Sequence, residues 1–142
     1  MLVYLDNCCY NRPFDEQNDL IVRLETEAKL RIQSMVKDGQ INLVCSGMLD
    51  YENNDNPFLE RRTRISRWES IAYIVVEIDE SIVESAIEFM GMGLKIKDAV
   101  HIACAVAAKA DFFITTDKGI LNKRISGMET VNPIDFVRKE LL

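Results

Sequence analysis

The 142-residue chain has few residues that interrupt regular structure, with six glycines and three prolines, and it contains no low-complexity tract. This composition excludes collagen-like, fibrous and disordered proteins. No apolar run approaches the roughly 18 residues that a membrane span requires. The first residues also lack the basic segment and the small-residue cleavage site of an export signal. We therefore expect a cytoplasmic protein with no membrane contact.

Metal and redox motifs built on cysteine or histidine are also missing. The four cysteines, Cys8, Cys9, Cys45 and Cys104, form neither a CxxC pair nor a zinc spacing, and the single His101 cannot complete a second ligand pair. We expect free, mostly buried thiols. Acidic residues outnumber basic ones by 23 to 17, which gives a net charge of −6. This balance excludes a protein that coats nucleic acid through bulk positive charge.

The apolar residues, 48% of the chain, are sufficient for one domain with a buried core, and we assign residues 1–142 to it. Short apolar runs predict strands at residues 2–5, 41–45, 71–78, 112–115 and 128–131. Apolar periodicity predicts helices over residues 19–38, 80–90 and 97–109, the first two ending at Gly39 and Gly91, and a further helix opening at Pro133. Strands that alternate with such helices predict an α/β fold, with a parallel sheet sandwiched by helices.

Four carboxylates are expected at one edge of this sheet. Asp6 and Asp117 each close a predicted strand, and the strands of a parallel sheet all end at the same edge. Glu52 follows Ser46 by six residues, about 9 Å of helical rise, so a helix starting there brings it over the same crevice. Asp98 begins an alanine-rich helix, whose start faces this edge if the helix runs antiparallel to the next strand.

Carboxylates this close repel one another unless a cation neutralises them. Oxygen ligands select hard ions, Mg²⁺ or Mn²⁺, which bind substrate phosphates, and the chemistry that follows is phosphodiester cleavage. Two of the acids also have structural interpretations, since Asp98 suits a helix start and Asp117 suits a turn cap. Asp6 is harder to explain structurally, because an acid at the end of a buried run is costly without a partner or a cation.

Four strings together resemble the PIN domain, the fold of the VapC-like toxin ribonucleases. They are Leu2-Val-Tyr-Leu-Asp6-Asn, Ser46 with Glu52 downstream, Lys97-Asp98-Ala-Val-His-Ile-Ala103 and Phe113-Ile-Thr-Thr-Asp117, and in this order they cover nearly the whole chain. The resemblance implies an Mg²⁺- or Mn²⁺-dependent endoribonuclease with the acidic quartet Asp6, Glu52, Asp98 and Asp117. The aspartates are the implied metal ligands, and Glu52 helps to place metal or water, with Asp50 as its competitor.

The resemblance further implies an RNA substrate and an antitoxin partner in a type II toxin–antitoxin pair. Trp68, Met90 and Met92 add apolar surface that favours a homodimer. Two other functions stay open. One is a PIN-like nuclease for RNA processing or branched DNA, and the other is a PIN-like scaffold that binds RNA or a protein without cutting.

Two residues near the predicted strand ends have both functional and structural interpretations. Arg12, one loop away from Asp6, is expected either to bind a substrate phosphate or to pin its own loop. Thr116 is expected to bind a phosphate oxygen or a metal-bound water, although threonines are common at strand ends.

The remaining polar candidates favour structural interpretations. His101, one helical turn after Asp98, is expected to be a satisfied, half-buried histidine rather than a site residue. A basic cluster in one predicted helix is expected to form a solvated face paired with Glu60 and Glu69 rather than an RNA contact: Arg61, Arg62, Arg64 and Arg67.

Overall fold

A parallel sheet forms the centre of the computed structural model, which describes residues 1–141 of the chain. Its strands are β1 (Leu2–Leu5), β2 (Asn42–Ser46), β3 (Ile74–Val76), β4 (Phe112–Ile114) and β5 (Glu129–Val131). They lie in the order β3-β2-β1-β4-β5, and every neighbouring pair is parallel. The chain builds outward from β1 to β3 and then returns to pair β4 with β1. The topological switch point therefore lies between β1 and β4.

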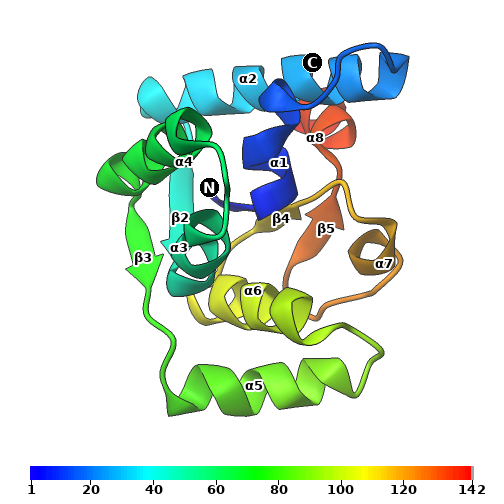
Figure 1. Cartoon of the computed structure of the whole chain (residues 1–142). Helices are drawn as coiled ribbons and strands as arrows, with labels where there is room; N and C mark the ends of the chain where they lie inside the picture. Colours follow the sequence, from blue (N-terminus) through cyan, green and yellow to red (C-terminus); the bar gives the residue numbers. More distant parts are fainter. Residues whose placement is uncertain (142) are drawn as a thin grey trace.

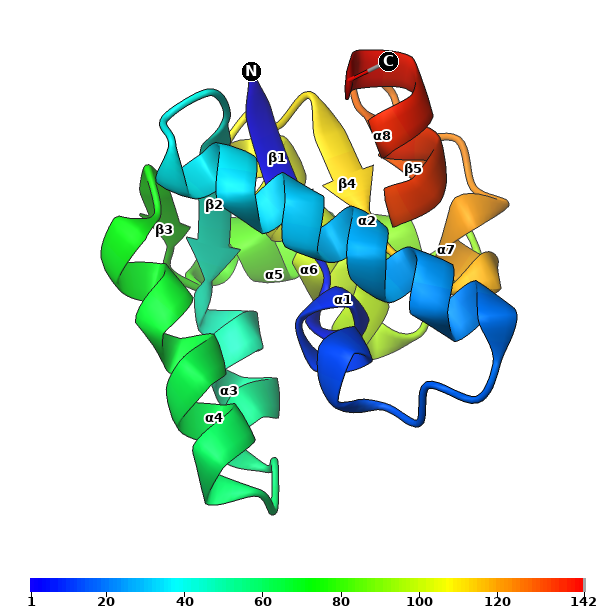
Figure 2. The same cartoon turned by 90° about the horizontal axis from the view of Figure 1, so that it is seen from above.

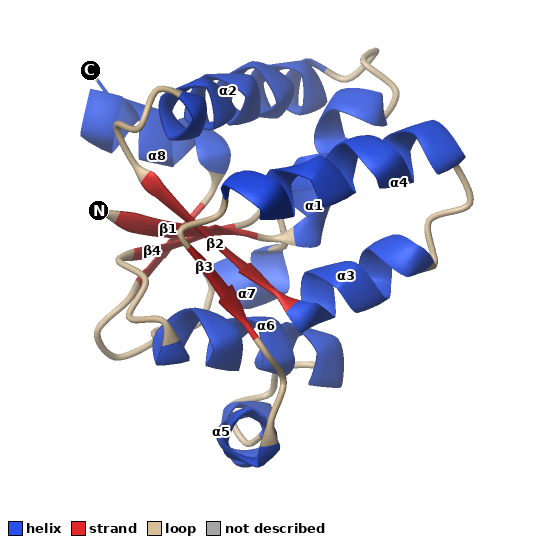
Figure 3. Ribbon diagram, turned by 90° about the vertical axis from the view of Figure 1, so that its left-hand side faces the viewer, coloured by secondary structure: helices blue, strands red, loops and turns tan. Residues whose placement is uncertain are grey.

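Helices cover both faces of this sheet (Figure 3). They are α1 (Asn7–Asn11), the 3₁₀ helix η1 (Arg12–Phe14), α2 (Leu20–Lys37), α3 (Gly47–Asn54), α4 (Leu59–Ser66), the 3₁₀ helix η2 (Arg67–Ile71), α5 (Glu80–Met90), α6 (Ile96–Ala107), α7 (Lys118–Leu121) and α8 (Pro133–Leu141). On one face α2 packs against α8, and on the other α6 lies against the sheet with α5 outside it (Figures 1 and 2). This architecture confirms the predicted α/β class.

The predicted helices begin and end at residues whose chemistry suits a helix end. Asp19 caps α2 by accepting hydrogen bonds from two backbone N–H groups of its first turn, and Gly39 follows the helix with a φ of +75°, a conformation that favours glycine. Asp79 caps α5 by accepting a hydrogen bond from the backbone N of Ile82 (3.0 Å). The central strand β1 is apolar because helices cover both faces of the sheet, and Val3 and Leu5 are fully buried.

Two local predictions were wrong. The strand expected over residues 71–78 is limited to β3, because the chain up to Ile71 turns as η2 and the sheet ends at this strand. The segment after β1, where the sequence predicted neither helix nor strand, begins with α1, which Asp6 caps through a hydrogen bond from the backbone N of Asn7 (2.8 Å). A helix of five residues is too short to leave an apolar period in the sequence.

Two predictions concern the surface of the molecule, a membrane span and a dimer. No helix within residues 1–141 is long and apolar enough to cross a membrane. Met90 and Met92, expected at a dimer surface, are each 41% exposed, whereas Trp68 is half-buried. The homodimer therefore stays a prediction, and α5 is one of the elements, with α2, that present apolar side chains to solvent.

Candidate active site at the switch point

The ends of β1 and β4 bring two of the predicted residues together. Leu5 pairs with Ile114, and the backbone N of Asp6 donates to the carbonyl of Ile114 (2.9 Å). Asp6 therefore lies beside Thr115, two residues before Asp117. The crevice outside the carboxyl ends of strands at a switch point is the usual ligand-binding place in open α/β sheets.

Asp6 is buried, with 6% of its surface exposed. One carboxylate oxygen accepts from the backbone N of Asn7, and the other accepts from the hydroxyl of Thr115 (2.8 Å each). These hydrogen bonds compensate for part of the free energy that burying a carboxylate requires. The arrangement also fixes the direction in which the carboxylate points.

Glu52 is held at the end of a chain of buried hydrogen bonds. The Ser46 hydroxyl bonds the Tyr4 hydroxyl (2.6 Å), which bonds Nδ1 of His101 (2.6 Å), and Nε2 of His101 lies 2.5 Å from Glu52 Oε1. Asn7 donates its side-chain amide to the other oxygen of Glu52 (3.1 Å). Burial alone would raise the pKa of Glu52, but the hydrogen bond and charge of His101 outweigh burial and lower it.

His101 is more deeply placed than the sequence suggested. The expectation of a half-buried side chain was wrong, because His101 is fully buried on α6. The expectation of a satisfied side chain is confirmed, since both ring nitrogens have partners. Its Nε2 also lies 3.8 Å from Asp6 Oδ1, so this histidine connects two of the predicted carboxylates. Its spacing of three residues after Asp98 was the signal for this position.

Asp98 and Asp117 complete the cluster from α6 and α7. Asp98 lies in the first turn of α6, is half-buried, and has no hydrogen-bond or ion-pair partner within residues 1–141. Burial raises its pKa, and the charges of Asp117, Asp6 and Glu52 raise it further against the opposing effect of His101. Asp117 is exposed and caps α7 by accepting from the backbone N of Gly119 (2.7 Å). The cap interpretation is therefore confirmed, and the other three acids are close enough to Asp98 to act on its pKa.

A divalent cation fits the donors of this cluster. The side chains offer carboxylate oxygens, and the uncompensated charge that raises the pKa of Asp98 is what a cation would neutralise. In the described part of the chain, no three His, Cys, Asp or Glu side chains converge as a ready-made metal site. Mg²⁺ is commonly bound through one or two carboxylates with waters in its other positions, so pairs of these acids suit it.

Asp50 and Glu52 lie on different sides of α3. Glu52 faces Asn7 and His101, whereas Asp50 lines a small cavity with Glu69. The pKa of Glu69 is raised by burial and by the neighbouring Asp50. The geometry therefore favours Glu52 over Asp50 as the acid beside Asp6.

Arg12 pins its loop. It pairs with Asp15 (3.0 Å) and with the buried carboxylate of Glu25 (3.1 Å), and its carbonyl accepts from Gln17 and Thr26. The structural interpretation is confirmed, and a phosphate contact by Arg12 stays a prediction.

Thr116 lies between β4 and α7 and is half-buried, and its backbone N donates to Sγ of Cys8 (3.4 Å). This hydrogen bond uses only the backbone of Thr116, so the phosphate contact of its side chain stays a prediction. The same thiol lies 3.5 Å from Asp6 Oδ2 and from the Thr115 hydroxyl. Cys8 is thus a neighbour of the cluster that the sequence analysis treated only as a free thiol.

The basic cluster and the cysteines have largely the structural roles expected of them. Arg64 pairs with Glu60 (3.0 Å), but Glu69 pairs with none of these arginines in the described chain, because Asp50 is its neighbour. Arg61 instead donates to the carbonyl of Phe14 (2.8 Å) and packs on aromatic rings. All four cysteines are free thiols, and all except Cys8 are buried.

Comparisons with known proteins agree with this fold. The family model of the PIN domain matches residues 20–125, a stretch that includes Glu52, Asp98 and Asp117 and begins after Asp6. Among solved structures, a chain of the VapBC2 complex from Rickettsia felis, bound to a DNA fragment from its promoter, is similar to this chain with a TM-score of 0.58. The two are 14% identical, and the match covers 93% of this chain and 98% of that one. No curated protein matches.

Proposed function

Because the chain belongs to the PIN domain family, a family of nucleases that generally depend on divalent metals, we propose that it is an Mg²⁺- or Mn²⁺-dependent endoribonuclease. The observation that carries this proposal is that Asp6, Glu52 and Asp117 lie near enough to Asp98 at the switch point for their charges to add to burial in raising its pKa. Lys97 and His101 lower the pKa of Glu52, but the other acids still raise that of Asp98, and carboxylates that oppose one another in this way have no structural use in common.

The aspartates and the glutamate differ in environment, which suggests different roles. Pairs among Asp6, Asp98 and Asp117 would hold the cation, which when bound would neutralise the phosphate and lower the pKa of a water. Glu52 is kept ionised by His101 and oriented by Asn7, so it is suited to position the attacking water and accept its proton. Thr116 and Arg12 stay candidates for contacts to the substrate phosphates.

The biological setting we propose is the toxin half of a type II toxin–antitoxin pair in the cytoplasm, with RNA as substrate and an antitoxin protein as partner. The fold shared with a chain of the VapBC2 complex supports this setting. A small DNA-binding protein encoded beside this gene, which restores growth when expressed with it, is the expected finding. A toxic protein that no neighbouring product neutralises would contradict the pairing but not the nuclease.

The nuclease proposal is tested with purified protein on single-stranded RNA, with Mn²⁺ or with EDTA. We expect cleavage only with the metal, and a loss of at least about 100-fold in rate for Asp6→Asn, since metal chemistry contributes several kcal/mol. Glu52→Gln should also lose most activity. Asp50→Asn is the matched control, because it removes a carboxylate from the same helix on its other side, and it should cleave normally.

The alternatives give different results in the same assay. Preference for branched DNA offered beside the RNA would favour the PIN-like nuclease for branched DNA. RNA binding without cleavage at any metal concentration would favour the non-catalytic scaffold. Full activity in EDTA, or in Asp6→Asn, would reject the metal-dependent site altogether.

A further inference from the structure

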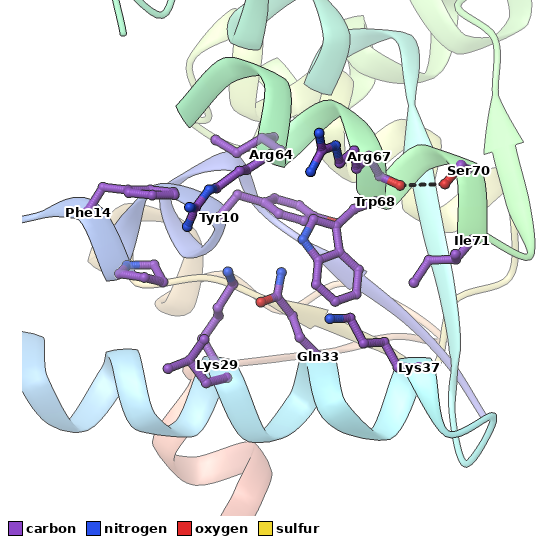
Figure 4. Close-up of a pocket in the computed structure, with 13 residues that line it drawn as sticks. Tyr10, Phe14, Lys29, Gln33, Lys37, Arg64, Arg67, Trp68, Ser70 and Ile71 are labelled. Atoms are coloured by element: carbon purple, nitrogen blue, oxygen red, sulfur yellow. Dashed lines mark hydrogen bonds between the residues drawn. The ribbon is translucent and has the colours of Figure 1, made fainter. Parts of the chain in front are cut away.

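A second site lies away from the carboxylates, between α2 on one side and α4 with η2 on the other. The pocket has a volume of about 850 Å³, within the range of small-molecule sites. None of the four predicted acids lines it. In Figure 4, Lys29, Gln33 and Lys37 reach from α2 into the space below Trp68.

The charge around this pocket is entirely positive. Four basic residues line it and no acidic residue does, in a protein whose net charge is −6: Lys29, Lys37, Arg64 and Arg67. Arg64 pairs with the exposed Glu60, but the other three have no carboxylate partner within residues 1–141. Such a concentration of one charge in an acidic protein favours an anionic ligand.

Gln33 and Lys29 each bring into the pocket a donor that has no acceptor in the described chain, and the donor of Gln33 is fully buried. Gln33 is 5% exposed, and its Nε2 is buried with no hydrogen-bond partner in the described chain. Lys29 is 4% exposed, and its Nζ, which still reaches solvent, has neither a hydrogen bond nor an ion pair there, and it lies 5.7 Å from the centre of the Tyr10 ring. Burial lowers the pKa of Lys29 to about 8. Unpaired buried donors are costly in a folded protein, and an acceptor on a ligand would remove that penalty.

Aromatic side chains form the other part of the pocket wall. Trp68 lies on η2 with Lys37 5.2 Å from its ring centre, and Tyr10 and Phe14 come from α1 and η1. Planar rings next to cations are the combination with which proteins hold a nucleobase and its phosphate. A purely apolar ligand would leave Lys29 and Gln33 unpaired, and a simple anion would leave the aromatic wall unused.

We propose that this pocket binds a nucleotide, with its phosphate oxygens on Lys29, Gln33 and the neighbouring cations and its base against the aromatic wall. The proposal does not depend on nuclease activity, because the pocket shares no residue with the carboxylate cluster. Tyr10 is on α1, the helix that Asp6 caps, so an occupied pocket would contact the element that also carries the cluster's Asn7.

Trp68 is the only tryptophan of the chain, which makes intrinsic fluorescence a probe of this pocket. We would titrate the whole protein in EDTA with AMP, UMP, adenosine, inorganic phosphate and citrate, and confirm binding by calorimetry. A nucleotide should give a saturable change with a Kd at or below about 1 mM. Adenosine and phosphate alone should each bind at least about tenfold more weakly, because each uses one part of the pocket.

Two variants connect binding to the buried donors. Lys29→Met and Gln33→Leu should each weaken AMP binding about tenfold. The melting temperature of the free protein should stay level or rise, since Gln33→Leu removes an unpaired buried donor and Lys29→Met removes a charge that burial disfavours. Arg31→Met is the matched control, because Arg31 is exposed on the same helix and does not line the pocket. It should bind AMP like wild type.

Several outcomes would contradict nucleotide binding in this pocket. No saturable binding of either nucleotide at about ten times that Kd limit would overturn the proposal. Citrate binding as tightly as AMP would show an unspecific anion surface. Undiminished AMP binding by Lys29→Met, or a marked loss of stability in both variants, would show that these side chains serve the fold rather than a ligand.

Discussion

Replacing Asp98 with asparagine tests whether the four acids form one site. The substitution conserves shape and removes one charge, and Asp98 has no hydrogen-bond or ion-pair partner within residues 1–141 that would be lost. Its raised pKa means that ionised Asp98 destabilises the folded state at pH 7. The variant should therefore be more stable than wild type when metal is absent.

Coulomb's law gives the expected gain in the free energy of unfolding for Asp98→Asn. A close pair of like charges is unfavourable by about 1 to 4 kcal/mol, depending on the effective dielectric. Because Asp98 is half-buried, solvent screening places it near the lower value. The first turn of α6 favours a negative charge by about 0.3–1 kcal/mol, so the net gain is about 0.5 kcal/mol. For a chain of this length, that raises the melting temperature by about 1 to 3 °C.

The pH dependence has a definite sign. The folded-state pKa of Asp98 lies above its unfolded value, so this group favours folding fully below about pH 3.9 and loses that contribution as pH rises through the folded pKa. The stability advantage of Asp98→Asn over wild type should therefore be largest at pH 7 and disappear towards pH 4. Glu52 behaves oppositely, because its pKa is lowered.

Thermal melts of both proteins in EDTA and in millimolar Mn²⁺ provide the measurement. Wild type should gain stability from Mn²⁺ through binding linkage, and Asp98→Asn should lose most of that gain. Glu80→Gln is the matched control, since Glu80 is an exposed first-turn acid of α5 away from the cluster. A variant that melts lower than wild type in EDTA, with an undiminished Mn²⁺ shift, would show that Asp98 only serves its helix.

Three further predictions concern the neighbouring structure. His101→Phe should lower the free energy of unfolding by about 2–4 kcal/mol in urea melts, whereas Tyr4→Phe, which keeps the Glu52 contact, should lose about 1 kcal/mol; equal losses would contradict the proposed importance of that contact. Ile87→Lys, on the exposed face of α5 where Ile87 is 62% exposed, should turn the predicted homodimer into a monomer by light scattering, and a monomeric wild type would reject the dimer. Arg12→Met should speed proteolysis of the loop before α2, and an unchanged KM for RNA would exclude the phosphate contact.

The sequence was most informative where one local pattern decides the structure. Helix α2 could be bounded within a residue because Asp19 and Gly39 mark its ends by their own chemistry. The strands β1 and β4 could be placed because buried strands leave short apolar runs. The length of the edge strand β3 was overestimated, because the apolar run that predicted it begins in the 3₁₀ helix η2. Helix α1 left no period to read.

In the candidate site, too, local patterns could place some residues and could not place others. The positions of Asp6 and Asp117 follow from strand ends, and Glu52 follows from helical rise, so the sequence could bring these acids to one edge. The chain from Ser46 through Tyr4 to His101 could not be predicted, because its partners are 42 and 97 residues apart and each is an ordinary core residue by composition. The pocket beside Trp68 was missed for the same reason, since its wall comes from five separate elements.

Two short spacings nevertheless explain why His101 meets the carboxylates. Tyr4 and Asp6 are two residues apart along β1 and its end, so both point to the same face of the sheet. Asp98 and His101 are three residues apart on α6 and share one side of that helix. Because α6 covers the face to which Tyr4 points, His101 bonds Tyr4 and lies 3.8 Å from Asp6 Oδ1. A shift of α6 by one residue along the sheet would break both contacts, so the packing of the core and the placement of the acids are fixed by the same register.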